Sequence, residues 1–268
     1  MLATTREIPQ DCAAAIAVNP RTTYLPAESD VLDAYLARGG AALLLYDLGF
    51  VVEPRLASLL DRLGVKLPQE VVVDPLDHYA TDHETVAVPV ADPHPITARV
   101  ALTFYPGVRP LTVLPPRPGV VVTPLVRSSK ESFSRPVVPA GADVARQPAP
   151  VAPRASGDRR GPHVLAAAIE GRWPEMAATA PPFRAVIAGD GDFASNSFLP
   201  YMANSDLALS MVRWLVREES ATKVRPAIPV PAMVLLSARE MQRIFLAVEV
   251  LLPLGVVFVG AVVWWRRR

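Results

Sequence analysis

The stretch FRAVIAGDGDFASNSFLPYMANSDLALSMVRWLVREE, residues 183–219, gives the clearest indication of the fold. Its opening residues, Phe183–Ala188, are an apolar run that predicts a buried strand, and a turn rich in Gly and Asp follows. Apolar residues then recur at helical spacing and predict a helix over Asn204–Glu218. A buried strand that leads through a tight turn into a helix is the unit with which α/β folds build ligand sites.

The same alternation of strand and helix occupies the N-terminal part of the chain. Cys12–Pro20 and Ala41–Asp47 are short continuous apolar runs, which are typical of buried strands in a parallel sheet. Glu28–Arg38 lies between them and has the apolar spacing of a helix, so the three segments form a βαβ unit. A second helix is expected over Pro54–Leu63 and a further strand around Val71–Val73. We therefore expect an α/β fold with a mostly parallel sheet.

The character of the sequence changes between residues 74 and 160. This region is rich in Asp, His and Pro, and many of the 29 prolines of the chain lie in it. Leu111–Leu114 and Gly119–Val126 have the composition of short β segments, whereas Ser132–Arg160 has no periodicity and is assigned no structure. His163–Gly171 is again strand-like. We interpret 74–160 as an irregular, β-rich and proline-rich insertion in the α/β domain.

The last apolar run of the chain, Ile244–Trp265, predicts a transmembrane helix. It carries a single charge over about 22 residues, which as a helix span about 33 Å, enough to cross the hydrocarbon core of a bilayer. Two tryptophans against the terminal arginines 266–268 resemble an interfacial belt with a basic flank. The predicted organisation is an α/β domain over 9–220, a proline-spaced linker over 221–243 and the helix over 244–265.

Basic residues flank this helix on both sides, with Arg266–Arg268 after it and Arg239 and Arg243 before it. The rule that basic flanks stay cytoplasmic favours a cytoplasmic C-terminus and an extracytoplasmic α/β domain. Glu249 and Pro253 lie one turn apart on one face of the helix. A carboxylate at this depth either contacts another membrane helix or reaches back to the headgroups. We take Glu249 and Pro253 as the contact residues for a membrane partner.

Composition excludes some classes of function. The 268 residues carry a net charge of +1, so the chain offers no basic surface for nucleic acid and we expect no nucleic-acid partner. A single cysteine, Cys12, rules out an internal disulfide framework. The N-terminus has no apolar run typical of a signal peptide, so an extracytoplasmic domain would depend on an upstream segment or on the C-terminal helix for its placement.

The chain resembles the gliding-motility-associated family of ABC-transporter auxiliary proteins in the runs YLARGGAALLLYD, HPIT, GPHVLAAAIEG and AGDGDFASNSFLPYMANSDLALSMVRWLV. The resemblance extends in order from about Pro9 to Arg268 and is most specific between Gly189 and Trp214. It implies a flavodoxin-like domain that is similar to a substrate-binding component and related in shape to class I glutamine amidotransferases and to an intraflagellar-transport domain. It further implies an extracytoplasmic domain beside an ABC permease and ATPase, with an upstream membrane helix and early βα units that this sequence lacks.

Polar residues after two of the predicted strands form a candidate ligand site. Asp190 and Asp192 follow one strand and Asp47 ends another, so parallel strands would bring them to the same edge of the sheet. Ser195 and Asn196 complete the candidate set. Two interpretations remain open: a polar ligand or cation site, and a structural role in which side chains of this turn cap the backbone that follows.

The run GDGDFA, residues 189–194, matches the pattern G-x-G-x-x-A that opens dinucleotide-binding folds. Asp190 and Asp192 oppose this interpretation, because they would place carboxylates beside a pyrophosphate. The helix after the run is followed by a linker rather than by a strand that ends in a ribose-binding acid. We expect no nucleotide and no other cofactor.

We expect no catalytic residue and no metal site elsewhere in the chain. The stretch between residues 74 and 84 has the residue types of a metal site, but its spacing fits no closed motif. Those residues are Asp74, Asp77, His78, Asp82, His83 and Glu84. The chain has no G-x-S-x-G motif, and Cys12 opens a strand, whereas an amidotransferase-like nucleophile would follow one. Ser128 and Ser129 follow a β segment, but most chains offer a serine and histidine pair by chance.

We therefore expect a membrane-anchored, non-catalytic auxiliary or solute-binding-like component of an ABC transport system. One alternative is a degenerate or unrecognised hydrolase that uses Asp47, Asp190 and Asp192, and a metal bound to those carboxylates would favour it. Another is a purely structural scaffold, which a complete lack of ligand binding would favour.

Overall fold

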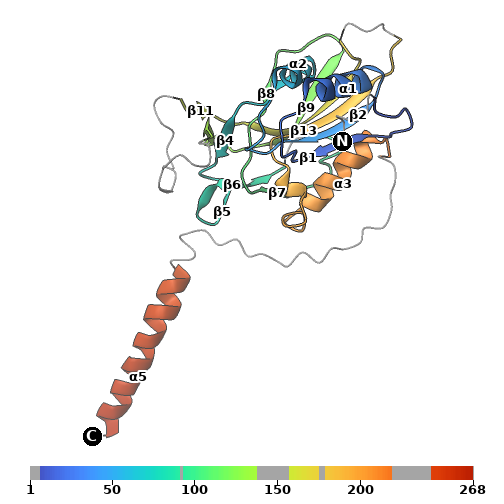
Figure 1. Cartoon of the computed structure of the whole chain (residues 1–268). Coiled ribbons are helices and arrows are strands. Elements are labelled where there is room, and N and C mark those ends of the chain that lie inside the picture. The colour runs from blue at the N-terminus through green and yellow to red at the C-terminus, as the bar shows by residue number, and fades with distance from the viewer. Residues whose placement is uncertain (1–6, 91–92, 138–156, 175–178, 219–242, 268) are drawn as a thin grey trace. The chain divides into compact units, whose positions relative to one another are not determined.

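The computed structural model describes residues 7–90, 93–137, 157–174, 179–218 and 243–267 (Figure 1). The chain divides into a folded unit and a second unit that contains the C-terminal helix. The folded unit is a mixed α/β structure, in agreement with the predicted fold class.

The folded unit is built around one five-stranded sheet, whose strand order is β1-β2-β13-β12-β9. Its strands are β1 (Ala15–Val18), β2 (Ala41–Leu45), β13 (Phe183–Ala188), β12 (Val164–Gly171) and β9 (Val120–Arg127). β1, β2 and β13 are parallel, whereas β12 is antiparallel to both of its neighbours. The prediction of a mostly parallel sheet therefore fails at β12 and β9. The physical reason is that residues 172–182, which connect β12 to β13, show no crossover helix in their described part, and a parallel pair needs a connection of about a dozen residues or more.

β9 lies inside 74–160 and forms one edge of the central sheet. Its edge position explains how Pro124, which has no N–H to donate, is tolerated opposite Ala167. At the other edge strand, β1, the prediction of burial is wrong on one face. Its two alanines pack against a hydrophobic cluster of the core, whereas Ile16 and Val18 point to the opposite face and are 54% and 44% exposed.

The remaining strands of this region form small antiparallel sheets beside the central one. Their members are β3 (Val65–Lys66) with β8 (Thr112–Val113), β4 (Glu70–Val73) with β10 (Phe133–Pro136) and β11 (Arg159–Arg160), and β5 (His78–Tyr79) with β6 (Asp82–Pro89) and β7 (Leu102–Tyr105). Two of these strands, β10 and β11, lie within Ser132–Arg160, for which no structure was predicted. They were missed because each is only a few residues long and pairs with a distant segment. Residues 138–156 lie outside the described part of the chain.

Helices cover both faces of the central sheet (Figure 1). α1 (Pro26–Ala37) and α2 (Pro54–Arg62) pack on one face, which receives Ala42 and Leu44 of β2. α3 (Asn204–Leu215) packs on the other, which receives Leu43 and Leu45. The apolar stripe that α3 buries has the helical spacing seen in the sequence: Leu207, Met211, Trp214 and Leu215. Burying one side chain of this size contributes about 1.5–3 kcal/mol, so this stripe holds the helix and the turn before it on the sheet.

The C-terminal helix has a break in its regular hydrogen bonding. A π-helical turn, Leu246–Leu251, precedes α5, Leu252–Arg267. Pro253 has no N–H to donate to the carbonyl of Glu249, which lies four residues earlier, and the wide turn occurs where that bond is missing. Within the continuous helix Arg243–Arg267 an 18-residue window has a mean hydropathy of 2.5, and the helix is, by length and composition, able to cross a membrane.

Gly189→Ala should destabilise the folded unit by about 2 kcal/mol, because an added Cβ would lie 1.9 Å from the backbone oxygen of Arg109 and push the end of β13 away from the segment that contains Arg109. Gly49→Ala is the matched control, since a Cβ there would meet no atom within 4 Å. Urea unfolding of the detergent-purified chain measures both. Equal midpoints for the two variants would contradict the close approach of β13 to Arg109.

Candidate functional site

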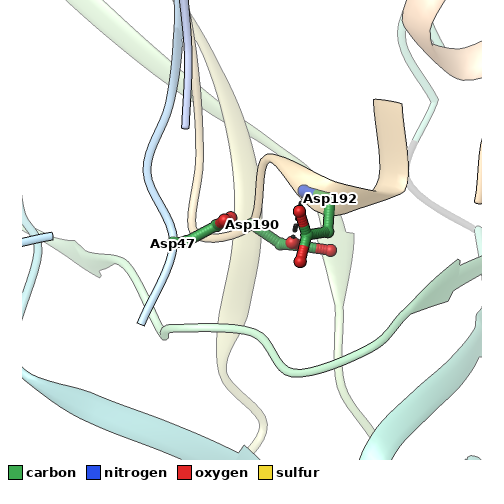
Figure 2. Close-up of side chains that lie close together, drawn as sticks. All are labelled: Asp47, Asp190 and Asp192. Atoms are coloured by element: carbon green, nitrogen blue, oxygen red, sulfur yellow. Dashed lines mark hydrogen bonds between the residues drawn. The ribbon is translucent and has the colours of Figure 1, made fainter. Parts of the chain in front are cut away.

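The candidate site lies where the parallel strands β1, β2 and β13 end. Asp47 follows β2, and Asp190 and Asp192 follow β13, so their strands deliver all three to one edge of the sheet, as predicted. Figure 2 shows the three carboxylates turned toward one another. Each offers an oxygen, and these oxygens all lie within 4.8 Å of one another. This is the one group in the described part of the chain that brings together three side chains able to ligate a metal.

Backbone groups occupy much of the hydrogen-bonding capacity of these carboxylates. Asp190 accepts from the backbone N–H of Asp192 at 2.8 Å and of Phe193 at 3.3 Å, and thereby caps the short 3₁₀ turn η2 (Asp192–Ala194). Asp47 accepts from the backbone N–H of Gly191. The backbone N–H groups that would bind a pyrophosphate are thus already bonded to carboxylates. This agrees with one of the two interpretations of the sequence, in which side chains of this turn cap the backbone.

Asn19 is a member of the site that sequence reasoning missed. It follows β1, and its side-chain amide donates to Oδ1 of Asp192 at 3.1 Å. Its backbone adopts a left-handed conformation, with φ of 44°, which Asn tolerates better than most residues. Asn followed by Pro at the end of an apolar run was the signal available, since it marks a turn at the same sheet edge as the aspartates.

Burial controls the electrostatics of the site. Asp190 is 1% exposed, and burial, followed by the negative charge of Asp47, raises its pKa well above the ordinary value. Burial also raises the pKa of Asp47, and the charge of Asp192 adds to this, while the N–H of Gly191 opposes it. Folding therefore favours the protonated form of both carboxyls.

A buried cation, Arg109, lies next to this group and was also missed. Its guanidinium donates to four backbone carbonyls. Nε donates to Pro68 at 3.1 Å and Nη2 to Leu67 at 2.9 Å, while Nη1 donates to Phe50 at 2.7 Å and to Asp47 at 3.3 Å. Burial lowers its pKa to about 10, and the charge of Asp47 opposes that shift. Arg109 therefore connects several loops through charged hydrogen bonds. Sequence analysis could not identify it, because its hydrogen-bond partners are all backbone oxygens and no sequence motif marks such an arginine.

A cavity of about 300 Å³ opens beside the aspartates, at the lower end of the range for small-molecule sites. Asp47 and Asp192 form part of its wall, together with Asn19, Arg21 and Phe50. Two carboxylates beside an arginine and an amide can bind a small polar molecule, or a hard cation through the carboxylate oxygens.

The other candidate residues do not join this group. Ser195 follows the turn, where its N–H donates to the carbonyl of Asp192 at 2.9 Å, and Asn196 is exposed. Asp74 is fully buried, and it accepts from the backbone N–H of Ser129 at 2.7 Å and its hydroxyl at 2.6 Å, which is a structural role. Cys12 is exposed and precedes β1.

Comparisons with known proteins give one family. Residues 1–216 match the family model ABC_transp_aux, described as an ABC-type uncharacterized transport system. No curated protein matches the chain. Among solved structures, the mmIFT52 N-terminal domain is similar at 18% identity with a TM-score of 0.49, over 76% of this chain and 77% of that one.

Asp190→Asn should remove much of a pH dependence of stability. Because folding raises the pKa of Asp190, its stabilising contribution is present below the ordinary value of 3.8 and is lost as pH rises through the folded value. As pH rises above the ordinary value, the free energy of unfolding should therefore fall more steeply in the unmodified chain than in Asp190→Asn. Urea titrations at each pH measure this, with the exposed Asp11→Asn as control. Parallel curves for all three proteins would contradict the raised pKa.

Proposed function

Because the chain belongs to the ABC_transp_aux family of ABC-type transport systems, we propose that it is a membrane-anchored, non-catalytic auxiliary or solute-binding-like subunit beside an ABC permease and ATPase. The observation that carries this proposal is the family match over residues 1–216, joined in one chain to an apolar helix of 25 residues. The narrower resemblance to the gliding-motility-associated group, with its flavodoxin-like domain, is part of the same proposal.

The anchor acts through effective concentration. Tethering the folded unit at the membrane holds it near a permease at about the millimolar concentrations typical of short flexible linkers, so weak contacts are sufficient for assembly. The linker predicted over 221–243 lies outside the described residues, except for its last residue, Arg243. The folded unit lies outside the cytoplasm in this proposal, with Arg266 and Arg267 at the cytoplasmic end of the helix.

Glu249 and Pro253 are the proposed contact with a membrane helix of the partner. Glu249 lies within the π-helical turn, and its side chain is exposed on the isolated helix. A carboxylate within a membrane span is stabilised by a polar or basic partner, and an irregular turn exposes backbone carbonyls that a neighbouring helix can bind. Both features therefore favour a partner at the same point of the helix.

The acidic edge supports a role in binding rather than in catalysis. The hydrogen bonds from Gly191, Asp192 and Phe193 hold Asp47 and Asp190 in capping roles, and the adjoining cavity has the size of a small-ligand site. The spacing of the three carboxylates favours one alternative, a hydrolase that uses a metal ion held by Asp47, Asp190 and Asp192. Calorimetric titration with Mg²⁺ and Mn²⁺ separates the two, since the auxiliary role needs no metal at this edge.

Glu249→Leu should abolish co-purification of a transporter. A permease and an ATPase should be recovered with the unmodified chain from detergent-solubilised membranes, and both should be lost from Glu249→Leu because the variant removes the carboxylate that the partner helix binds. Phe258→Leu, an apolar change on an exposed position of the same helix, should retain them. Failure to recover either partner with the unmodified chain would contradict the transporter assembly itself.

Protease added to intact cells should digest the folded unit and leave the C-terminal end protected. A C-terminal epitope tag, followed by immunoblotting, measures this as a shift of the tagged band to a small fragment. Lysed cells provide the control in which both ends are accessible. Full protection of the folded unit in intact cells would place it in the cytoplasm and contradict the proposed orientation.

A further inference from the structure

A second cavity lies at the end of the central sheet opposite to the aspartates, where β2 and β13 begin and where α1 and α3 end. Its volume is about 490 Å³. Three arginines are part of its wall, Arg38 after α1, Arg184 in β13 and Arg217 after α3, and none of its described lining residues is acidic. It is therefore distinct from the acidic site, since the whole length of β2 and β13 separates the two.

Each arginine is held in place by a backbone carbonyl. Arg184 donates from Nη1 to the carbonyl of Trp214 at 2.6 Å and lies over the indole ring at 4.5 Å from its centre. Arg217 donates from Nη2 to Pro182 at 3.1 Å. Arg38 donates to the carbonyl of Ile8 and lies 5.2 Å from the centre of the Tyr35 ring. A guanidinium has five N–H donors, so these anchors fix the groups and leave further donors for a ligand.

The positive charge of this cavity is poorly balanced. Arg38 and Arg217 form no ion pair within the described part of the chain. Arg184 pairs with Glu170 across β12 and β13 at a long 3.5 Å, and Glu170 is 51% exposed. By contrast, another arginine-lined cavity contains Arg159, which is bound to Glu70 at 2.7 Å. Like charges gathered in a concave site whose described wall carries no carboxylate attract an anion.

We propose that this cavity binds a small anionic ligand through phosphate or carboxylate groups. Planar guanidinium groups bind such oxygens in pairs, and a volume of about 490 Å³ accommodates a molecule of the size of pyrophosphate or citrate. The same chemistry is available from a soluble anion or from the headgroup of an anionic lipid. This site goes beyond the proposed transporter assembly and does not depend on it.

The first test is calorimetry on the full-length chain in a neutral detergent, with pyrophosphate and citrate as probes against chloride of equal ionic strength. Binding should weaken by about tenfold or more in Arg38→Gln and in Arg217→Gln, because each removes a charged donor. Arg117→Gln, at an exposed position outside the cavity, is the matched control and should bind as the unmodified chain does. Absence of heat from both anions, or equal weakening by Arg117→Gln, would overturn the proposal.

Glu170→Gln distinguishes lost charge from structural damage. It removes the carboxylate that partly neutralises Arg184 and should therefore tighten anion binding by about threefold or more, the opposite of the arginine variants. A variant that merely disturbed the fold would weaken binding. Unchanged or weaker binding in Glu170→Gln, with an unaltered circular dichroism spectrum, would overturn the proposal.

Cys12 supplies a local readout, because it is the single cysteine of the chain, is exposed and forms part of this cavity wall. Saturating pyrophosphate should slow its alkylation by the uncharged reagent N-ethylmaleimide, and the same concentration should give no protection in Arg38→Gln. An unaltered rate in the presence of measurable heat of binding would place the anion elsewhere and overturn the proposal.

The source of the ligand is resolved by a lipid arm. Short-chain phosphatidic acid is compared with phosphatidylcholine in the same detergent, with Cys12 alkylation as the readout. Protection by phosphatidic acid that exceeds protection by pyrophosphate identifies a lipid headgroup, and the reverse identifies a soluble anion. Protection by phosphatidylcholine equal to that by phosphatidic acid would show that charge is irrelevant and overturn the proposal. Loss of the transporter partners in Glu249→Leu leaves these results unchanged, so the two proposals fail independently.

Discussion

The acidic edge of this fold depends on the buried guanidinium of Arg109. A charge that is 1% exposed is strongly unfavourable unless hydrogen bonds satisfy it, and here carbonyls of Phe50, Leu67 and Pro68 do so. The backbone N–H of the same residue bonds to the carbonyl of Gly189 at 2.8 Å. Arg109 thus joins the loop after β2, the segment before β4 and the end of β13. Asp47 and Asp190 belong to two of those segments. The parallel pairing of β2 with β13 brings them to the same place, and Arg109 holds the segments that follow the two strands together.

Local patterns predicted the elements but not all of their partners. Phe183–Ala188 was predicted with its observed bounds, and the helix after it begins at Asn204 as expected, because apolar periodicity is a local property. The meeting of Asp47 with Asp190 also followed from sequence, since both come directly after strands that run parallel. The antiparallel β12 did not, because its direction depends on the connection over residues 172–182 and not on its own apolar run. The edge strand β9 did not, because its partner β12 lies beyond residues 128–163. The role of Arg109 could not be predicted either, because its partners are backbone oxygens, and any residue type can supply a backbone oxygen.

The two ends of the parallel strands β2 and β13 have opposite chemical character. The ends of β1, β2 and β13 gather carboxylates, whereas the beginnings of β2 and β13, with the ends of α1 and α3, gather arginines. Carbonyl groups at the ends of helices favour cations, so α1 and α3 help to retain Arg38 and Arg217 at that end. The folded unit therefore offers two separate polar sites, one of each sign, while the apolar faces of the sheet are covered by helices.

The place of β13 in the sheet also determines when the sheet can be completed. β2 pairs with β1 on one side, which is nearby in sequence, but its other neighbour begins more than half the chain later, where Ala41 lies opposite Arg184. During synthesis the inner edge of β2 has no partner until β13 has left the ribosome, and by then most of the chain has been made. Pairings of such long sequence separation form slowly. The sheet can therefore close only after β13 has been made, late in synthesis and shortly before the C-terminal apolar helix follows.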